Sequence, residues 1–502
     1  MTNLNNTFPA PVYSETVLAP LYEGVKQHHW KYLMKINFAH GVMLHEQKLL
    51  TLPEVREILK ALQEIEKDIG SRIGSMAYTG QYEDFFFEVD TTLRQKVGMD
   101  IGGKLHMARS RNDIDHTLFR MALKDHMLEF LDTLLNLLKG LIETAERHAK
   151  TVIVAYTHGQ PAQPSTWGHY LAAFIEILLR DTERLLLALQ QIDLSCMGAA
   201  AITTTGFPIS RERMAELLGF AAIQENSYGC IASCDGYMGV YAALQILFTD
   251  VGRFVQDLVM RTSFEVGHLH VPRAFVQISS IMPQKRNPVA VEHLRLLSSL
   301  AASRAGAFLQ IMHNTPFADM NDSEGEVQGA SYQTFEYGQR ALRLLTELIK
   351  VIEVNEDKVR QHIDESGVAM TELADSLVRS EGISFRQGHE IASRLAEILI
   401  QEKITVSSLS FSVFKTVFLE VTGRSATVNE ETFRSYLTPE HFIAVRTLPG
   451  GPAFQPLTSS LSRYSVEADK QRAVTTSYIN RKKESDQILD AAVKSLLSSP
   501  SE

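Results

Sequence analysis

Residues 118–150 read LFRMALKDHMLEFLDTLLNLLKGLIETAERHAK, and apolar residues recur in this stretch at steps of three and four. This is the period of an amphipathic helix. Proline costs about 3 kcal/mol inside a helix, and none occurs between residues 54 and 160. At 1.5 Å per residue, a helix of about thirty residues is ~45 Å long. The stretch therefore predicts a long helix of the kind found in helix bundles.

The same period continues through four further stretches, at residues 168–193, 236–264, 289–312 and 327–352, whereas strand-like alternation is scarce. We therefore expect an all-α protein in which five long helices pack as an antiparallel bundle. Some apolar stripes cover nearly half of the helix circumference, which is more than one bundle face requires. They indicate either contacts between the subunits of a homo-oligomer or a helix buried centrally within a monomer.

The chain divides into three predicted domains. Residues 1–116 hold shorter helices and the aromatic cluster YEDFFFEVD (82–90), and residues 117–364 form the central long-helix bundle. Residues 365–502 are richer in Gly, Ser and Thr, and we expect a small C-terminal helical domain there. We expect the serine-rich end of this domain to fray.

Composition excludes several classes of function. The 502 residues carry a net charge of −10 and no long basic block, so nucleic-acid or membrane-surface binding has no electrostatic support. Apolar runs are too short to span a bilayer, and the N-terminal stretch lacks the pattern of a secretory signal. Three cysteines in so long a chain favour buried thiols in a reducing cytoplasm. The histidines lack ligand partners at metal-site spacing and no phosphate-binding glycine loop occurs, so we expect no metal or cofactor.

Three polar stretches lie between the helical stretches: KLHMARSRND (104–113), YTHGQPAQPS (156–165) and SSIMPQKRNP (279–288). We call them the first, second and third islands. Each has an ordinary structural explanation, because SRND can cap a helix, THGQP can form a turn and a Lys-Arg pair can be solvated. Their chemistry also suits an anionic substrate: Arg111 offers a planar fork for a carboxylate, and His158 titrates near neutrality.

Taken together, the islands resemble, in order and spacing, the three signatures of the argininosuccinate lyase family within the fumarase/aspartase superfamily. That family typically carries KLHTGRSRND, YTHLQ.AQP and GSS.MPQK.NP. Further agreement occurs in residues 198–220, 225–227 and 372–397. The resemblance implies a cytoplasmic homotetramer with a twenty-helix core, in which each active site gathers the three islands from three subunits. It also implies reversible β-elimination of fumarate from an N-substituted aspartate, without cofactor or metal.

The resemblance assigns roles to residues of each island. Ser279 would be the catalytic base, Lys285 would hold the charge that develops on the substrate carboxylate, and His158 would be oriented by Glu292. Preorganised donors of this kind contribute about 3–4 kcal/mol each to a transition state. The remaining matches are expected to bind the succinyl half of the substrate: Ser110, Arg111, Asn112, Thr157, Ser280, Met282 and Asn287.

The match fails where the family recognises the arginine half of argininosuccinate. Losing a buried charged hydrogen bond costs roughly 2–5 kcal/mol, which is enough to change the accepted amine. We therefore expect a different N-succinyl substrate, with ethylenediamine-N,N'-disuccinate (EDDS) as a candidate and an EDDS lyase-like member as the specific relative. The alternatives are an authentic argininosuccinate lyase of arginine biosynthesis and an inactive structural homologue. The departures at the arginine half are Tyr22, Lys26, Asp319, Glu324 and Val327. Two departures lie elsewhere: the family's DVH is DFF at 84–86, and the glycine before the paired serines is Ile278.

Overall fold

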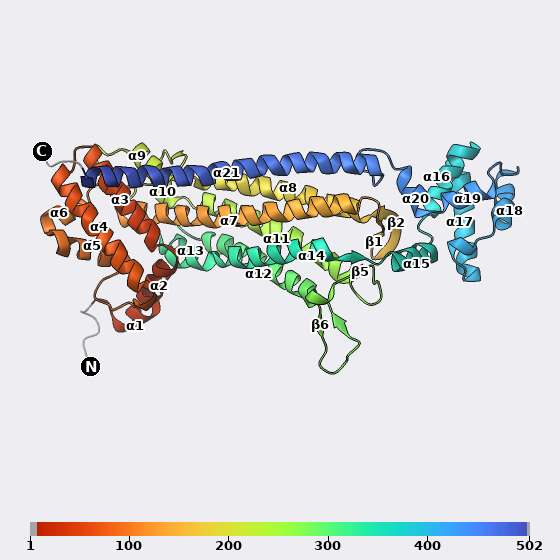
Figure 1. The fold of residues 1–502 in the computed structure, drawn as a ribbon, viewed down its shortest axis with the longest axis horizontal. Coiled ribbons are helices and arrows are strands. Elements are labelled where there is room, and N and C mark those ends of the chain that lie inside the picture. Colours follow the sequence, from red (N-terminus) through yellow and green to blue (C-terminus); the bar gives the residue numbers. More distant parts are fainter. Residues whose placement is uncertain (1–7, 499–502) are drawn as a thin grey trace.

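The computed structural model describes residues 8–498, so the last four residues of the expected frayed end lie outside the described part of the chain. The helices formed by the predicted long-helix stretches lie side by side along the molecule (Figure 1). The all-α class and the long-helix bundle are therefore confirmed. The bundle helices are α7 (Arg111–Arg147), α8 (Trp167–Ile192), α11 (Asp235–Arg261), α12 (Val289–Met312) and α14 (Gln333–Val351).

The bundle is held together by close packing of large and small side chains. Phe130 on α7 meets Phe248 of α11 and Phe335 of α14 edge to face, at centroid distances of 5.8 and 5.9 Å. A Cβ atom on Gly338 of α14 would lie 2.4 Å from the Phe248 ring, so only glycine permits this approach. Such close packing makes even one added methyl group costly.

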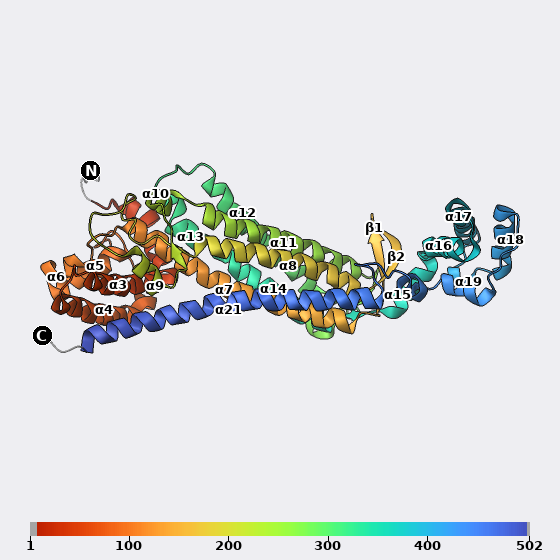
Figure 2. The ribbon, with the colours of Figure 1, turned by 90° about the horizontal axis from the view of Figure 1, so that it is seen from above.

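A further long helix, α21 (Phe454–Ser498), runs back along the bundle from the C-terminal helices to the N-terminal ones (Figure 2). Its 45 residues pack on α7, α8 and α4 and contribute Leu457 and Leu461 to the main core. Gln471 donates to the Leu179 carbonyl at 2.9 Å. The predicted C-terminal domain, residues 365–502, includes these residues. Several buried positions of α21 are polar, such as Thr475 and Ser485, so its apolar period is weak.

The shorter helices form two groups at the ends of the bundle. The N-terminal group shares one continuous apolar core with the bundle, whereas residues 373–437 enclose a separate core. The N-terminal elements are α1 (Pro11–Tyr13), the π-helix η1 (Ser14–Leu18), α2 (Ala19–His28), α3 (Trp30–Glu46), α4 (Leu52–Arg72), the 3-10 helix η2 (Ile73–Ser75), α5 (Phe85–Val97) and α6 (Met99–Lys104). The C-terminal elements are α15 (Glu356–Ser366), α16 (Met370–Glu381), α17 (Phe385–Glu402), the 3-10 helix η5 (Val406–Ser408), α18 (Phe411–Thr422), α19 (Glu430–Tyr436) and α20 (Pro439–Ala444).

Short strands and helices connect the bundle helices. Two antiparallel hairpins, β1 (Val152–Thr157) with β2 (Gln160–Thr166) and β6 (Gln277–Ile278) with β7 (Arg286–Asn287), carry the second and third islands. The other pairs are β3 (Leu194–Ser195) with β4 (Ala222–Ile223), which are parallel, and β5 (Leu269–His270) with β8 (Glu353–Val354), which are antiparallel. The connecting helices are α9 (Arg211–Leu218), α10 (Ser227–Ala232), α13 (Gly325–Ser331) and the 3-10 helices η3 (Arg273–Phe275) and η4 (Asn321–Ser323). Within residues 8–498, no helix is long and apolar enough to cross a membrane.

Candidate active site

The first island ends in the first turn of α7, where helix capping and site geometry use the same residues. Ser110 is the N-cap residue, and its backbone N–H donates to the Asp113 carboxylate at 2.8 Å. Its hydroxyl donates to the Asn112 side-chain oxygen at 3.2 Å. The capping explanation of SRND is therefore correct, and capping fixes Ser110, Arg111 and Asn112 at the start of a long rigid helix.

Asp113 joins this turn to the loop that follows β3. Its second carboxylate oxygen accepts the backbone N–H groups of Gly198 and Ala200 at 2.9 and 3.0 Å. Asn112 donates to the Ala201 carbonyl at 3.0 Å. Burial raises the pKa of Asp113 to about 6, while its three backbone donors act in the opposite direction. Residues 198–201 are thus positioned against the first island by a buried carboxylate.

The Arg111 guanidinium already binds carboxylates of its own chain. One of its guanidinium nitrogens donates to Glu83 at 3.0 Å and to Asp84 at 2.7 Å. The same guanidinium lies 5.1 Å from the centroid of the Phe87 ring. Any substrate carboxylate that binds Arg111 must therefore share it with carboxylates of the N-terminal helices.

The second island forms the β1–β2 hairpin, with His158 and Gly159 in its two-residue turn. Both residues have positive φ, 52° and 75°, which is the backbone of the type I′ turns that match the twist of paired strands. Thr157 and His158 are exposed. Among the described residues, His158 has no hydrogen-bond or ion-pair partner. THGQP therefore forms a turn, as the structural explanation predicted, and the side chain of His158 in that turn is exposed to solvent.

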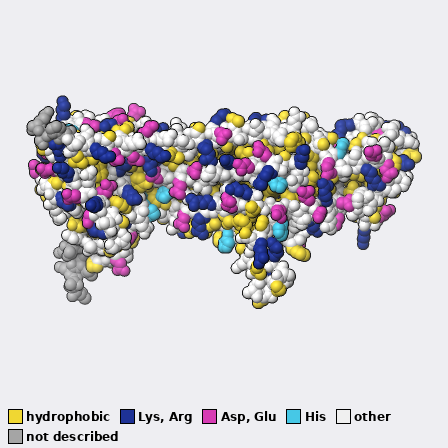
Figure 3. All heavy atoms as spheres, viewed as in Figure 1, with side chains coloured by type: hydrophobic (Ala, Val, Ile, Leu, Met, Phe, Trp, Pro, Cys, Tyr) yellow, Lys and Arg dark blue, Asp and Glu magenta, His cyan; other side chains and the backbone are white. Residues whose placement is uncertain are grey.

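The third island forms the loop of the β6–β7 hairpin, which projects from the side of the bundle (Figures 1 and 3). The Ser279 hydroxyl oxygen accepts the backbone N–H groups of Ile281 and Met282, at 3.4 and 3.1 Å. The backbone N–H of Lys285 donates to the Met282 carbonyl at 3.0 Å. Two amide donors at one hydroxyl oxygen stabilise negative charge on that oxygen.

The remaining residues of the third island are also open to solvent. Ser280, Met282 and Lys285 are exposed, and Asn287 is half-buried in β7. Ile278 is 57% exposed, so the side chain that replaces the family glycine does not pack into the core. A cavity of about 630 Å³ opens at the base of the hairpin and is lined by Lys285, Asn287 and the 96% exposed Phe264, among others.

The chain by itself does not bring the three islands together. The first and second islands lie at opposite ends of α7, whose 37 residues span about 55 Å. The third projects from the flank of the bundle (Figure 1). Glu292, exposed in the first turn of α12, makes no contact with His158 among the described residues.

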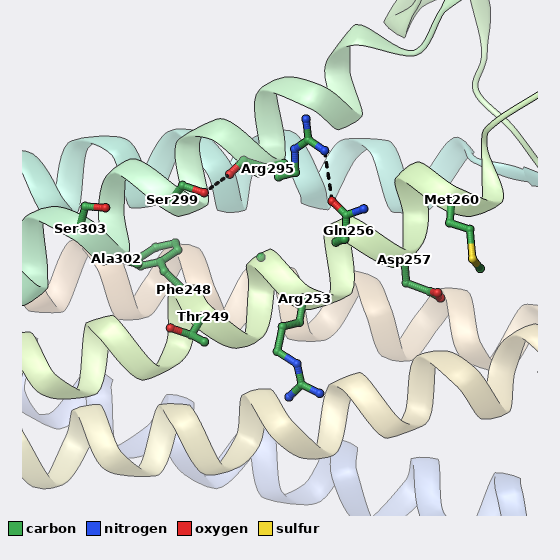
Figure 4. Close-up of a pocket in the computed structure, with 11 residues that line it drawn as sticks. Phe248, Thr249, Arg253, Gln256, Asp257, Met260, Arg295, Ser299, Ala302 and Ser303 are labelled. Carbon is green, nitrogen blue, oxygen red and sulfur yellow. Dashed lines mark hydrogen bonds between the residues drawn. The ribbon is translucent and has the colours of Figure 1, made fainter. Parts of the chain in front are cut away.

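A separate groove of about 830 Å³ lies between α11 and α12 (Figure 4). Its lining includes the small residues Gly252, Ala302 and Ser303. Across it, the Arg295 guanidinium donates a hydrogen bond to the Gln256 side-chain oxygen at 3.1 Å. No predicted site residue lines it. On the same two helices Ile246 and Leu296 are 44% and 52% exposed.

The two N-terminal departures from the family pattern, Tyr22 and Lys26, form hydrogen bonds within their own chain. The buried Tyr22 donates to Glu88 at 2.6 Å, and Lys26 pairs with Glu23 at 2.8 Å while donating to the Met76 carbonyl. Burial, followed by the hydrogen bond to Glu88, raises the pKa of Tyr22 above its ordinary value. These side chains are engaged by their own chain instead of facing the first island.

Two further departures, Asp319 and Glu324, lie near residues of α7. Asp319 and Glu324 flank η4, and Asp319 approaches the His116 ring at 3.7 Å. Burial and the neighbouring Asp319 raise the pKa of Glu324 to about 7. Burial, with the charges of Glu324 and Asp84, also raises the pKa of Asp115 well above its usual range.

Sequence reasoning missed Asp113, Asp115 and His116 as members of the site. Serine followed three residues later by an acid is a capping signal, and it could have identified Asp113. Asp115 and His116 carry no comparable signal, because their neighbours come from loops distant in the sequence.

Within residues 8–498, no group of three or more His, Cys, Asp or Glu side chains is arranged to hold a metal ion. Cys196 and Cys230 are buried and Cys234 is half-buried, all as free thiols.

Comparison with known proteins agrees with the residue pattern. A family model described as Lyase matches residues 31–301, and one described as Argininosuccinate lyase C-terminal matches residues 368–444. Argininosuccinate lyase 2 of Agrobacterium fabrum is 50% identical over 471 residues, which cover 93% of each chain.

Solved structures extend the likeness to three dimensions. An EDDS lyase variant with bound fumarate is 25% identical, has a TM-score of 0.83, and the match covers 96% of this chain and 97% of that one. The class II fumarase of Schistosoma mansoni, at 16% identity and a TM-score of 0.66 over 86% and 92% of the two chains, shares the fold. The chain belongs to the argininosuccinate lyase family of the fumarase/aspartase superfamily and is a carbon–nitrogen lyase.

Proposed function

We propose that this enzyme releases fumarate from an N-substituted aspartate by reversible β-elimination, with Ser279 as the base. The observation that carries the proposal is the Ser279 hydroxyl oxygen, which accepts two backbone N–H groups on the hairpin that also bears Lys285 and Asn287. A serine is a poor base at its ordinary pKa. Its two amide donors stabilise its alkoxide form, and the Lys285 ammonium on the same hairpin favours negative charge in this loop.

In this mechanism Ser279 takes a proton from Cβ of the substrate. The electron pair moves into the adjacent carboxylate, which becomes a dianion held by Lys285 and Asn287. It then returns to form the Cα–Cβ double bond while the C–N bond breaks and its electron pair leaves with nitrogen. His158, oriented by Glu292, either supplies the proton that the leaving nitrogen takes up or only orients the groups around it.

We propose that the working site is assembled from several copies of the chain, as a homotetramer. The support is geometric, because the three islands lie far apart in one chain. The single chain also leaves four of their residues exposed to solvent: Thr157, His158, Ser280 and Lys285. The exposed apolar residues beside the α11–α12 groove provide surface for such an assembly. We place the enzyme in the cytoplasm, with its three thiols reduced.

The proposed substrate is an N-succinyl amine other than argininosuccinate, with EDDS as the first candidate. The support is that Tyr22 and Lys26 are held by their own chain and that Asp319 and Glu324 add acidic groups beside the first island. Authentic argininosuccinate lyase activity is the second candidate, favoured by the 50% identity to a protein of that name.

The test is direct turnover. The purified protein is incubated with argininosuccinate and with EDDS, and fumarate is followed by its ultraviolet absorbance. Equal or faster turnover of argininosuccinate would contradict the divergent-substrate proposal. Absence of fumarate from both would favour an inactive structural homologue. The Ser380→Ala variant, on the exposed face of α16, is the control for Ser279→Ala.

A further inference from the structure

A cavity outside the proposed reaction site lies between α15 and the C-terminal helices that follow it. Its volume is about 340 Å³, which is near the lower end of the range of small-molecule sites. The residues that line it come mainly from α15, η5, α19 and α20, at the end of the molecule remote from the N-terminal helices (Figure 1). Among these described lining residues, none belongs to an island. The cavity is therefore separate from the three islands.

The cavity lies where two apolar cores meet. Ile363 of α15 belongs to a small core that also contains Val152 and Val154 of the β1–β2 hairpin. Val406 and Leu437 belong to the separate core of the C-terminal helices. We call Ile363, Val406 and Leu437, which all line the cavity, the apolar floor. A ligand on this floor would contact both cores, and junctions between separately packed units are common places for small-molecule sites.

The polar lining of the cavity carries charges of both signs. Arg360 and Arg434 are cationic, Asp364 and Glu440 are anionic, and we call these four side chains the charged rim. Arg360 donates to Oε1 of Glu440 at 2.8 Å through one guanidinium nitrogen. Within the described part of the chain, Glu440 Oε2 and the other two nitrogens of Arg360 have no hydrogen-bond partner. The rim can therefore accept from a ligand ammonium and donate to a ligand carboxylate.

Hydrogen bonds to one serine hold the rim in place. The Asp364 carboxylate accepts the backbone N–H and the hydroxyl group of Ser407, at 2.7 and 2.8 Å. The Arg434 guanidinium donates to the Ser407 carbonyl at 3.2 Å and to Glu430 at 3.3 Å. Ser407 thus ties α15 to α19 beside the cavity. Because these side chains are already ordered, a ligand that binds them loses less affinity to side-chain ordering.

The chemistry of the ligand follows from the floor and the rim together. The rim has two cations and two anions, so it matches a ligand that carries one charge of each sign better than one with a net charge. The floor favours a ligand with an apolar side chain, and the volume favours a small one. We propose that this cavity binds a free α-amino acid with a branched aliphatic side chain. Its carboxylate lies at the two guanidiniums, its ammonium at the two rim carboxylates and its side chain on the apolar floor.

Four small molecules test each part of this match by calorimetric titration of the intact protein. Leucine carries all three groups, whereas 4-methylpentanoate lacks the ammonium, 3-methylbutylamine lacks the carboxylate and alanine lacks the branched side chain. We expect each of the last three to bind about tenfold or more weakly than leucine. Equal affinity for any one of them, or no binding of leucine at concentrations up to about 10 mM, would overturn the inference.

The Arg360→Gln variant tests the contact with the ligand carboxylate. We expect it to weaken leucine binding by about tenfold or more and not to weaken binding of 3-methylbutylamine, which has no carboxylate. Arg394→Gln is the matched control, because Arg394 is also exposed and pairs with Glu390 at 2.7 Å but does not line the cavity. Thermal unfolding confirms that both variants are folded. Unchanged leucine binding in Arg360→Gln, or an equal loss for both ligands, would contradict the inference.

Hydrogen exchange of the intact protein locates the ligand without any substitution. Bound leucine should slow exchange in α15, η5 and α19, on both sides of the cavity, and leave α3 unchanged. Protection confined to the three islands would place leucine in the reaction site and overturn the inference. None of these measurements requires turnover, so their outcome is independent of whether the proposed fumarate-releasing function is correct.

Discussion

The first turn of α7 and the 279–288 hairpin carry the two halves of the proposed chemistry and differ in how they are held. Asp113 is completely buried and accepts three backbone N–H groups, so the succinyl-binding turn is fixed by its own chain. Lys285 on the hairpin is exposed, and the hairpin has only two paired residues on each strand. Substitutions in the first region should therefore alter stability and substrate binding, whereas substitutions in the hairpin should alter turnover.

The largest effect is expected for Ser279→Ala. Removing the proposed base should lower kcat by about 10²–10⁴-fold, because proton abstraction loses its acceptor. Thermal unfolding should be unchanged, since the hydroxyl accepts only hydrogen bonds within an exposed loop. Steady-state kinetics and calorimetry on one preparation measure both quantities. A clear fall in unfolding temperature would contradict the contrast between the two regions.

The Asp113→Ala variant should show the opposite pattern. Three backbone N–H groups, those of Ser110, Gly198 and Ala200, would lose their acceptor inside the protein. We expect a loss of about 3–5 kcal/mol in the free energy of unfolding, measured by urea denaturation, and a raised KM. A stable variant with reduced kcat alone would place Asp113 in the chemical step instead.

A smaller effect follows from Glu324. Its folded pKa of about 7 exceeds the ordinary value of 4.5, so the folded state binds its proton more tightly than the unfolded state. The contribution to stability is complete below about pH 4.5 and is lost as the pH rises through 7. Glu324→Gln should therefore stabilise the protein at pH 8 by about 1–3 kcal/mol and have less effect at pH 5. Unfolding temperatures at both pH values, with Glu326→Gln as control, measure the difference; an equal shift at both would contradict it.

The smallest effect on stability is expected for Ile278→Gly, which restores the family residue at the base of the hairpin. Because this side chain is mostly exposed, the free energy of unfolding should change by only about 0.5–1 kcal/mol. The added backbone freedom should change the rate of hairpin closure and with it kcat. Hydrogen exchange of residues 277–287 is the measurement, and unchanged exchange would show that the hairpin is already as mobile as glycine permits.

The sequence predicted the bundle because its helices have long, regular apolar stripes, and it singled out the third island because the polar residues of SSIMPQKRNP resemble a family signature. It did not place α21 on the bundle, since the buried face of that helix includes Gln471 and Thr475. Nor could it reveal that acidic side chains gather beside the first turn of α7. Asp84, Asp115, Asp319 and Glu324 come from three separate segments, and only the folded chain brings them to one place.

The central claim is that dispersed islands of separate copies complete one fumarate-releasing site. The most direct test mixes two inactive variants, Arg111→Ala and Ser279→Ala, after dissociation and reassembly, with different affinity tags to confirm that mixed oligomers form. A site that takes its first island from one variant and its third from the other contains only intact residues, so the mixture should regain fumarate release that neither variant shows alone. Mixed oligomers that remain inactive, beside a reassembled wild-type control that recovers, would contradict a site shared between copies.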